Sequence, residues 1–416
     1  WKVPHFEKML YDNGQLIGLY SDAFLEFRNP LFRDVVEQTV AFAEREWVSE
    51  EGLFCSSLDA DSEGEEGKYY TWTRDELQTI IGEDFRRFAE YYRLDSGGLW
   101  ENGRYILLRE EEPADFATGR RLDPSAFREK IQRWNHLLLE ARKQRVPPLL
   151  DDKLLTSWNA LMISGLVKAH RALKDARSLD LALGAARYLA RRFRSEGGKL
   201  YRNYKDGKPA IPAFHIDYAL FAEACIDLFE VTMDLEWWQL ARDLVDLTME
   251  DFLDRESGMF RFSSGGEDFL VSNFTEDQDN VIPSSNSVMA TNLFRLGHLM
   301  TDSTYLSLAG SMLEKMSGSF EQYPHGFARW GRLLLHSLYP FYEVVVTGPS
   351  SPELLREMTG EYLPHVIMAG SATGEELPLF ENRVDREKNR IFICRDNVCR
   401  LPVENSEDAK RICHTE

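Results

Sequence analysis

Hydrophobic residues recur at helical spacing along most of the chain. Apolar positions three and four residues apart, with polar and charged positions between them, are typical of amphipathic helices. Short polar links join these helices in pairs, so αα-hairpins are the expected building units. The predicted helices cover residues 15–28, 31–47, 73–81, 83–91, 124–141, 156–173, 179–194, 215–232, 236–253, 287–300 and 304–316.

The predicted hairpins repeat along the chain. Leading helices begin near Thr156, His215 and Ser285, at intervals of about 60 to 70 residues, and a glycine–aromatic segment such as Gly258-Met259-Phe260 follows each pair. Stacked units of this kind bury apolar faces that none can bury alone. We predict an all-α fold, an (α/α)6 toroid with short β excursions whose leading helices form the inner layer. An open solenoid is the alternative.

The pattern changes after about residue 340. The run from Tyr342 to Thr347 is rich in β-branched residues and ends at Gly348, and a helix over 352–360 and strands over 365–369 and 390–394 follow. This predicts a small C-terminal α/β appendage packed on the toroid. The expected domains are therefore 1–340 and 341–416.

Composition narrows the function classes. The 416 residues carry a net charge of −20, which argues against nucleic-acid and anionic membrane partners. No apolar run is long enough to span a bilayer, so we expect a soluble protein. The first residue is Trp1 and no signal pattern follows it, which suggests a segment of a longer precursor.

The cysteine usage is that of a reducing compartment. Five cysteines in a chain of this length do not form a disulfide framework, so we expect a cytoplasmic location. Cys394 and Cys399 are five residues apart, and no histidine cluster completes a zinc site near them. We predict a structural role for these cysteines, no metal and no cofactor.

The segment Asp151–Ile163, DDKLLTSWNALMI, places polar residues at the start of a long helix. Thr156 or Ser157 is a plausible N-cap, and helix starts carry partial positive charge and unpaired N–H groups. Trp158 and Asn159 could therefore face a ligand. The alternative is that Trp158 anchors the core and Asn159 caps the helix.

Polar and aromatic residues stand at the start of every leading helix. If those helices form the inner ring, their first residues gather at one end of the toroid. Saccharides are recognised by aromatic faces and by Asp or Asn side chains that pair with hydroxyls. We predict substrate-binding roles for Glu7, Lys8, Tyr11, Asp12, Lys153, Trp158, Asn159, Asp217, Tyr218 and Asn286.

Two acidic segments stand out. Asp59 to Gly64 resembles the start of a calcium loop, but the twelfth position is Tyr70 where a glutamate is needed, so calcium is not expected. Glycoside hydrolysis uses two carboxyl groups, and Asp59 and Asp61 are candidates for them. The segment Glu276–Asp279 is expected to be solvated surface, where removing charge changes stability by no more than about 0.5 kcal/mol.

Four long motifs resemble the YyaL-like, spermatogenesis-associated thioredoxin-domain proteins. They are HFEKMLYDN at His5–Asn13, SSLDADSEGEEGKYYTWT at Ser56–Thr73, DDKLLTSWNALMISGL at Asp151–Leu166 and IPSSNSVMATNLFRLG at Ile282–Gly297. The resemblance implies an (α/α)6 region similar to N-acylglucosamine 2-epimerases. It also implies an N-terminal thioredoxin-like domain as a partner of this region in the full-length protein.

Two function classes follow from the resemblance and the motifs. In the first, the chain is a sugar isomerase or epimerase that binds a saccharide at the inner-helix starts, with His5 as the proton-transfer group. A glycosidase using Asp59 or Asp61 is a variant of this class. In the second, the toroid is a non-catalytic module that binds a ligand or serves the thioredoxin-like domain. Fold analogy alone does not decide between them.

Overall fold

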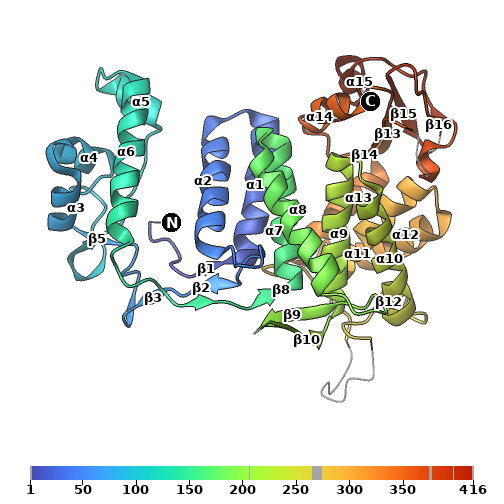
Figure 1. Cartoon of the computed structure of the whole chain (residues 1–416), viewed down its shortest axis with the longest axis horizontal. Helices are drawn as coiled ribbons and strands as arrows, with labels where there is room; N and C mark the ends of the chain where they lie inside the picture. Colours follow the sequence, from blue (N-terminus) through green and yellow to red (C-terminus); the bar gives the residue numbers. More distant parts are fainter. Residues whose placement is uncertain (1, 206, 265–273, 374–376, 397, 415–416) are drawn as a thin grey trace. The chain divides into compact units, whose positions relative to one another are not determined.

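The computed structural model describes residues 2–205, 207–264, 274–373, 377–396 and 398–414 (Figure 1). The chain divides into two compact units. Unit 1 comprises Trp1–Met9 and Ser57–Asp151, and unit 2 comprises Leu10–Ser56 and Asp152–Glu416. The domain boundary predicted at residue 340 falls within unit 2 and stays a prediction. Within the described ranges, every helix is too short or too polar to cross a bilayer.

Unit 1 combines short antiparallel strands with four α-helices around an aromatic core. Trp72, Phe88, Phe127 and Trp134 are buried in one cluster, and Trp134 meets Phe88 and Phe127 edge to face. β1, β2 and β7 form a three-stranded sheet. The elements are β1 (Lys8–Met9), β2 (Ser57–Leu58), β3 (Asp61–Ser62), β4 (Glu65–Glu66), β5 (Trp72–Thr73), α3 (Arg74–Ile81), η1 (Gly82–Asp84), α4 (Phe85–Tyr91), η2 (Glu101–Gly103), β6 (Arg104–Tyr105), α5 (Pro113–Gly119), α6 (Pro124–Arg142) and β7 (Leu150–Asp151).

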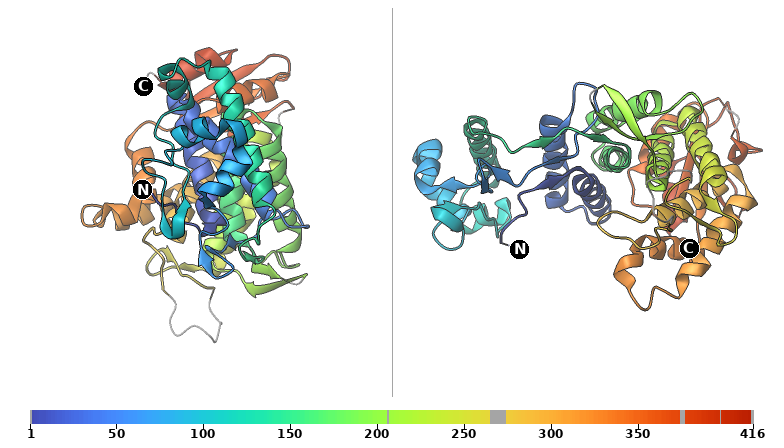
Figure 2. Two further views of the ribbon diagram at one scale, coloured as in Figure 1. Left: turned by 90° about the vertical axis from the view of Figure 1, so that its left-hand side faces the viewer. Right: turned by 90° about the horizontal axis from the view of Figure 1, so that it is seen from below.

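Unit 2 is built from helical hairpins, and Figure 2 shows their helices close to end-on in its right-hand view. The first helices of successive hairpins pack against each other in the order α1, α7, α9, α11, and α13 packs on α11. The elements are α1 (Leu10–Phe27), α2 (Pro30–Trp47), β8 (Leu154–Leu155), α7 (Thr156–Leu173), α8 (Ala176–Arg192), β9 (Tyr201–Lys205), β10 (Lys208–Pro212), α9 (His215–Thr232), α10 (Leu235–Asp251), β11 (Leu253–Asp254), β12 (Met259–Phe260), α11 (Ser285–Met300), α12 (Ser303–Ser317), η3 (Pro324–Phe327) and α13 (Ala328–Leu338).

One turn geometry connects the two helices of each hairpin. The residue after the first helix is left-handed, with φ of 53° to 59°, and the next residue is the Asn or Asp that begins the second helix. The left-handed residue ends the first helix, and a short polar side chain suits the N-cap of the next. The four pairs are Arg28-Asn29, Lys174-Asp175, Met233-Asp234 and Thr301-Asp302.

These contacts confirm the all-α class and the toroid of hairpins with short β excursions. The helices α1 and α13, the first and last of the inner set, line one cavity together with α7 and α9, so the inner helices surround a common axis. The α9 helix lies deepest, with 14 of its 18 residues buried. α1 begins at Leu10, five residues before the predicted start, so Tyr11 and Asp12 lie within its first turn.

The α/β appendage that was predicted for the C-terminal region is also confirmed. Its sheet has the order β14-β13-β15-β16, with β13 parallel to β14 and antiparallel to β15. All six residues of β13 are buried, which explains the unbroken β-branched run in the sequence. The elements are β13 (Tyr342–Thr347), α14 (Ser351–Thr359), β14 (Val366–Ser371), η4 (Pro378–Phe380), β15 (Arg390–Arg395), β16 (Val398–Cys399) and α15 (Ser406–His414).

Candidate functional site

Two asparagines at the inner-helix starts hold the glycine–aromatic segments in place. Asn159 on α7 accepts a hydrogen bond from the Phe54 N–H at 2.8 Å and donates to the Phe54 carbonyl at 2.9 Å. Asn286 on α11 makes the same pair of bonds with Phe260, at 2.8 and 2.9 Å. Both side chains are fully buried. The repeated glycine–aromatic segments are therefore pinned to the helix starts by buried amides.

The helix start of α9 carries a buried carboxylate. Asp217 accepts hydrogen bonds from the N–H groups of Ser157 and Phe214, at 3.2 and 3.0 Å, and pairs with Arg202 at 3.3 Å. Burial raises the pKa of Asp217 more than these partners lower it. The neighbouring Tyr218 hydroxyl accepts a hydrogen bond from the Leu200 N–H at 2.9 Å. These groups link helix starts to the adjoining strands.

The remaining predicted residues of unit 2 are more accessible. Trp158 is half-buried and meets Tyr11 edge to face, with 4.8 Å between ring centroids. Asp12 and Lys153 are exposed. A role in ligand binding stays a prediction for all of these residues, as it does for Asn159, Asp217, Tyr218 and Asn286.

The predicted catalytic residues belong to unit 1. His5 is exposed, and Asp59 and Asp61 are exposed neighbours in which the Asp61 N–H donates to the Asp59 carboxylate at 3.3 Å. Glu7 is exposed, whereas Lys8 is half-buried. The Lys8 Nζ donates a hydrogen bond to the carbonyl of Phe6 at 2.8 Å. Burial, followed by the charge of Arg142, lowers the Lys8 pKa to about 8. Their catalytic and substrate-binding roles stay predictions.

The interpretation of Glu276–Asp279 as solvated surface is wrong. The Asp279 carboxylate accepts hydrogen bonds from the N–H groups of Ser284 and Arg329, at 2.9 and 2.8 Å, where α11 and α13 begin. Glu276 accepts from the Ser285 N–H at 3.1 Å. Acidic side chains at helix starts satisfy N–H groups that have no helical partner. This segment therefore organises two inner helices.

A cavity of about 350 Å³ lies among the inner helices, and its walls come from the middle of α1, α7 and α9 and from the start of α13. We call it the central cavity. A deeper cavity of about 110 Å³ adjoins it and is lined in part by residues of the segment 361–367 of the appendage. The two cavities share six lining residues, which are Asp22, Lys168, Glu223, Asp227, Arg329 and Arg332. The predicted substrate-binding residues are not among the described residues that line either cavity.

Opposite charges pair within the two cavities. Lys168 on α7 pairs with Asp22 on α1 at 2.6 Å, and Arg329 on α13 pairs with Glu223 on α9. In the deeper cavity, Arg295 on α11 bridges two further carboxylates of α9, Asp227 at 2.8 Å and Glu230 at 2.6 Å. Ion pairs thus join α1 to α7 and α9 to α11, which are neighbours, and also α9 to α13.

Arg332 differs from these cations. It lines both cavities and forms no hydrogen bond or ion pair with another described residue. The nearby Arg329 charge is the main cause that lowers the Arg332 pKa, with burial second. An unpaired guanidinium beside a second one favours a ligand that brings oxygen acceptors.

The sequence contained a signal for these residues. Glu223, Asp227 and Glu230 recur at positions i, i+4 and i+7 of a largely apolar helix, which places three carboxylates on one face. Arg329, Arg332 and His336 show a similar spacing on α13. Within the described part of the chain, no cluster of three or more His, Cys, Asp or Glu side chains could hold a metal ion.

Asn159→Ala should lower the free energy of unfolding by about 2 kcal/mol, because both backbone groups of Phe54 would lose their buried partner. Asn286→Ala should lower the free energy of unfolding by a similar amount, because the backbone groups of Phe260 would lose the same two hydrogen bonds. Urea unfolding measures both effects. A loss of ligand affinity without a loss of stability would instead support the substrate-binding role predicted from the sequence.

Comparison with known proteins identifies homologues. No protein-family profile matches the chain. Spermatogenesis-associated protein 20 of Homo sapiens is 28% identical over 465 residues, which cover 100% of this chain, and the Rattus norvegicus protein is 27% identical over 463 residues. The chain is a homologue of spermatogenesis-associated protein 20. Those relatives are thioredoxin-domain-family proteins, as the four motifs indicated. The chain spans 58% of the length of spermatogenesis-associated protein 20.

Solved structures share part of the architecture. A cellobiose 2-epimerase from Spirochaeta thermophila aligns with a TM-score of 0.47 and 13% identity, over 77% of this chain and 62% of that one. A GH76 alpha-mannanase from Bacteroides thetaiotaomicron aligns with a TM-score of 0.43 and 13% identity, over 75% of this chain and 62% of that one. At these scores, nothing about the chemistry of this chain follows from the likeness.

Proposed function

We propose that unit 2 binds a saccharide-type ligand in the central cavity. The supporting observation is that charged or polar side chains from α1, α7, α9 and α13 converge on one cavity among the inner helices. Its volume of about 350 Å³ is in the range of small-molecule sites. A sugar hydroxyl both donates and accepts hydrogen bonds. Carboxylate groups can accept its hydrogen bonds, and guanidinium groups can donate to its oxygen.

Small residues let two helices pack closely along one wall of the cavity. Gly14 and Gly18 on α1 and Gly165 on α7 line this wall, and a Cβ at Gly14 or Gly165 would meet backbone atoms of the facing helix. Leu19 and Leu161 add apolar surface to the same wall. A wall of this kind suits the apolar face of a sugar ring, while the charged groups lie on α9 and α13.

The available side chains favour isomerase or epimerase chemistry over hydrolysis. Glycoside hydrolysis needs a carboxylic acid with a raised pKa, but Glu223 is paired with Arg329, and Asp227 with Arg295. Burial is the largest single cause and raises the Asp227 pKa, but Arg295, Ser164 and Lys168 together lower it by more, so that the net shift is downward. An isomerase instead needs a proton-transfer group beside the ligand, and His325 lines the central cavity.

Titration calorimetry with neutral sugars, uronates and sugar phosphates tests this proposal. Arg332→Gln should weaken binding at least about tenfold, because a charge-assisted hydrogen bond contributes about 1.5–3 kcal/mol. Arg33→Gln is the matched control, since Arg33 lies on α2 and pairs with Glu37 at the surface. Equal affinity of Arg332→Gln and the parent chain would place the ligand elsewhere.

A bound sugar should then be tested for turnover in D₂O. Deuterium entering at the carbon beside the carbonyl, and absent in His325→Ala, is the result expected of an isomerase or epimerase. Binding without exchange would support the non-catalytic module. If no sugar of any class binds, the saccharide proposal is wrong.

A further inference from the structure

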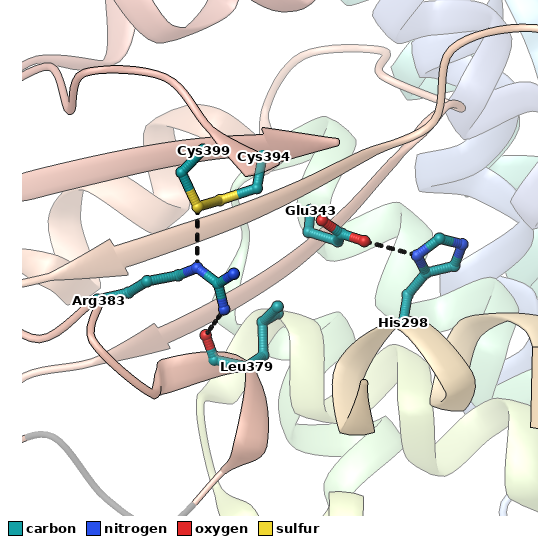
Figure 3. The surroundings of a disulfide bond; sticks show 6 residues. All are labelled: His298, Glu343, Leu379, Arg383, Cys394 and Cys399. Atoms are coloured by element: carbon teal, nitrogen blue, oxygen red, sulfur yellow. Dashed lines mark hydrogen bonds and ion pairs between the residues drawn. A yellow bond between two sulfur atoms is a disulfide. The ribbon is translucent and has the colours of Figure 1, made fainter. Parts of the chain in front are cut away.

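A disulfide joins Cys394 on β15 to Cys399 on β16 (Figure 3). The two cysteines lie directly opposite each other at one edge of the sheet of the appendage. They are five residues apart, and a crosslink restrains the unfolded chain least when it closes so short a loop. The ladder between β15 and β16 already holds the same strands together. The disulfide therefore adds little to the stability of the fold. This observation speaks against the structural role predicted for these cysteines and favours a role in chemistry.

The two sulfurs differ in accessibility. Cys394 is fully buried, whereas Cys399 is half-buried at the end of the edge strand. Two apolar residues next to Cys399 are unusually exposed, Val398 at 75% and Leu401 at 91%. Exposed apolar residues that flank a reachable cysteine along the chain are suited to contact with another protein. A thiolate from solution can therefore approach Cys399 and not Cys394.

Arg383 is held against the accessible sulfur. Its Nε donates to the Cys399 Sγ at 2.9 Å, and a terminal guanidinium nitrogen donates to the Leu379 carbonyl at 2.8 Å (Figure 3). The Arg383 backbone N–H also donates to the Phe380 carbonyl at 2.9 Å. A positive charge fixed beside a cysteine stabilises its thiolate. Arg383 therefore makes Cys399 a good leaving group from a mixed disulfide with a partner.

We propose that Cys394–Cys399 is a thiol–disulfide exchange centre whose partner is a thioredoxin-like dithiol. A partner thiolate attacks the Cys399 Sγ, the S–S bond breaks, and Cys394 leaves as a thiolate that takes up a proton. The second partner thiol, once deprotonated, attacks the partner sulfur of the mixed disulfide. Cys399 then leaves as a thiolate beside Arg383. Two electrons have passed from the dithiol to this chain, and the partner carries the new disulfide.

Two observations support this class of partner. The homologues of the chain are thioredoxin-domain-family proteins, and a thioredoxin-like dithiol is the co-reactant that the exchange needs. The exposed side chains of Val398 and Leu401 offer it an apolar contact surface. The proposal does not depend on the saccharide site, because none of these residues lines the two cavities.

The other cysteines serve as internal controls. Cys55, Cys225 and Cys413 are buried and lie outside the disulfide. Burial raises the pKa of Cys413 to about 11 and that of Cys225 well above its ordinary value. Both should therefore stay protonated and unreactive in the folded chain.

The first test treats the oxidised chain with a catalytic amount of a purified thioredoxin, its reductase and NADPH. Alkylation followed by mass spectrometry should find two new thiols, at Cys394 and Cys399, and one NADPH consumed per chain. The reductase and NADPH without thioredoxin should leave the bond intact. Reduction by dithiothreitol but not by thioredoxin would overturn the proposal.

The second test measures the role of Arg383. In Cys394→Ser, the alkylation rate of Cys399 against pH should have a midpoint below the ordinary thiol pKa of about 8.5. Adding Arg383→Gln should raise that midpoint by about one unit or more, and Arg386→Gln, an exposed change in the same loop, should not. A midpoint unmoved by Arg383→Gln would exclude the assigned role of this arginine. If Cys394→Ser does not fold, the thioredoxin test on the parent chain still decides the proposal.

Discussion

Arg295→Met should lower the free energy of unfolding by about 4 kcal/mol at neutral pH, because removing one member of a buried ion-pair network leaves its partners unpaired. Arg295 bridges Asp227 and Glu230, and all three side chains are no more than 15% exposed. Methionine has a similar length, so little packing volume is lost. Urea unfolding of the variant and the parent chain at neutral pH measures the effect.

The pH dependence gives this prediction a second, independent readout. In the parent chain the Asp227 pKa is lowered, so its stabilising charge is present above the unfolded pKa of about 4 and is lost as the pH falls through the lower folded value. In Arg295→Met, only Ser164 and Lys168 still oppose burial, so the folded pKa of Asp227 should lie above its value in the parent chain. Protonation then favours the folded variant more than the folded parent chain, so the stability gap between them should narrow as the pH falls towards 4.

Arg33→Met is the control for this experiment. Arg33 forms an exposed pair with Glu37 on α2, and pairs of that kind contribute about 0.5 kcal/mol or less. Two results would show that the carboxylates of α9 are stabilised by other groups. One is a loss of stability in Arg295→Met as small as that in Arg33→Met, and the other is a stability difference between Arg295→Met and the parent chain that does not change with pH.

Gly165→Ala should lower the free energy of unfolding by about 3 kcal/mol, because α1 and α7 approach each other too closely for a methyl group. A Cβ at Gly165 would lie 2.3 Å from the Gly14 carbonyl oxygen and 3.1 Å from its carbon. These are backbone atoms, which cannot rotate away as a side chain would. The helices must separate, and the unfavourable contact outweighs the gain of about 1 kcal/mol in helix propensity.

Gly184→Ala is the matched control for the glycine prediction. Gly184 lies in α8 at an exposed position, and no atom lies within 4 Å of where its Cβ would be. With only helix propensity at work, this variant should be more stable than the parent by about 0.5–1 kcal/mol. Thermal and urea unfolding compare the two. Equal stabilisation in both variants would mean that α1 and α7 have more room than their backbones indicate.

The sequence predicted the helices well where periodicity and local signals agree. Thr156 and His215 begin α7 and α9 where the apolar spacing placed them. Gly14 is a poor helix former, and the predicted helix began after it, yet it lies inside α1 because α7 packs against it there. Tertiary contact thus overrode a local propensity.

The candidate site was harder to predict. Asn159 and Asn286 stood out because they are polar residues at helix starts, and only the structure shows that their amides bind the backbones of Phe54 and Phe260. The cavity charges were missed because they lie in helix interiors, where an isolated Lys168 or Arg295 resembles a surface residue. A charged stripe on an otherwise apolar helix was the signal available.

The sequence by itself determined the helical hairpins and their connections, the β-rich appendage and the relationship to spermatogenesis-associated protein 20. Helix spacing and caps arise from residues a few positions apart, so a linear pattern records them. Only the tertiary structure decided which charges meet: Lys168 reaches Asp22 across 146 residues, and Arg329 reaches Glu223 across 106. Such pairs depend on how the inner helices pack around one axis, which no local pattern specifies.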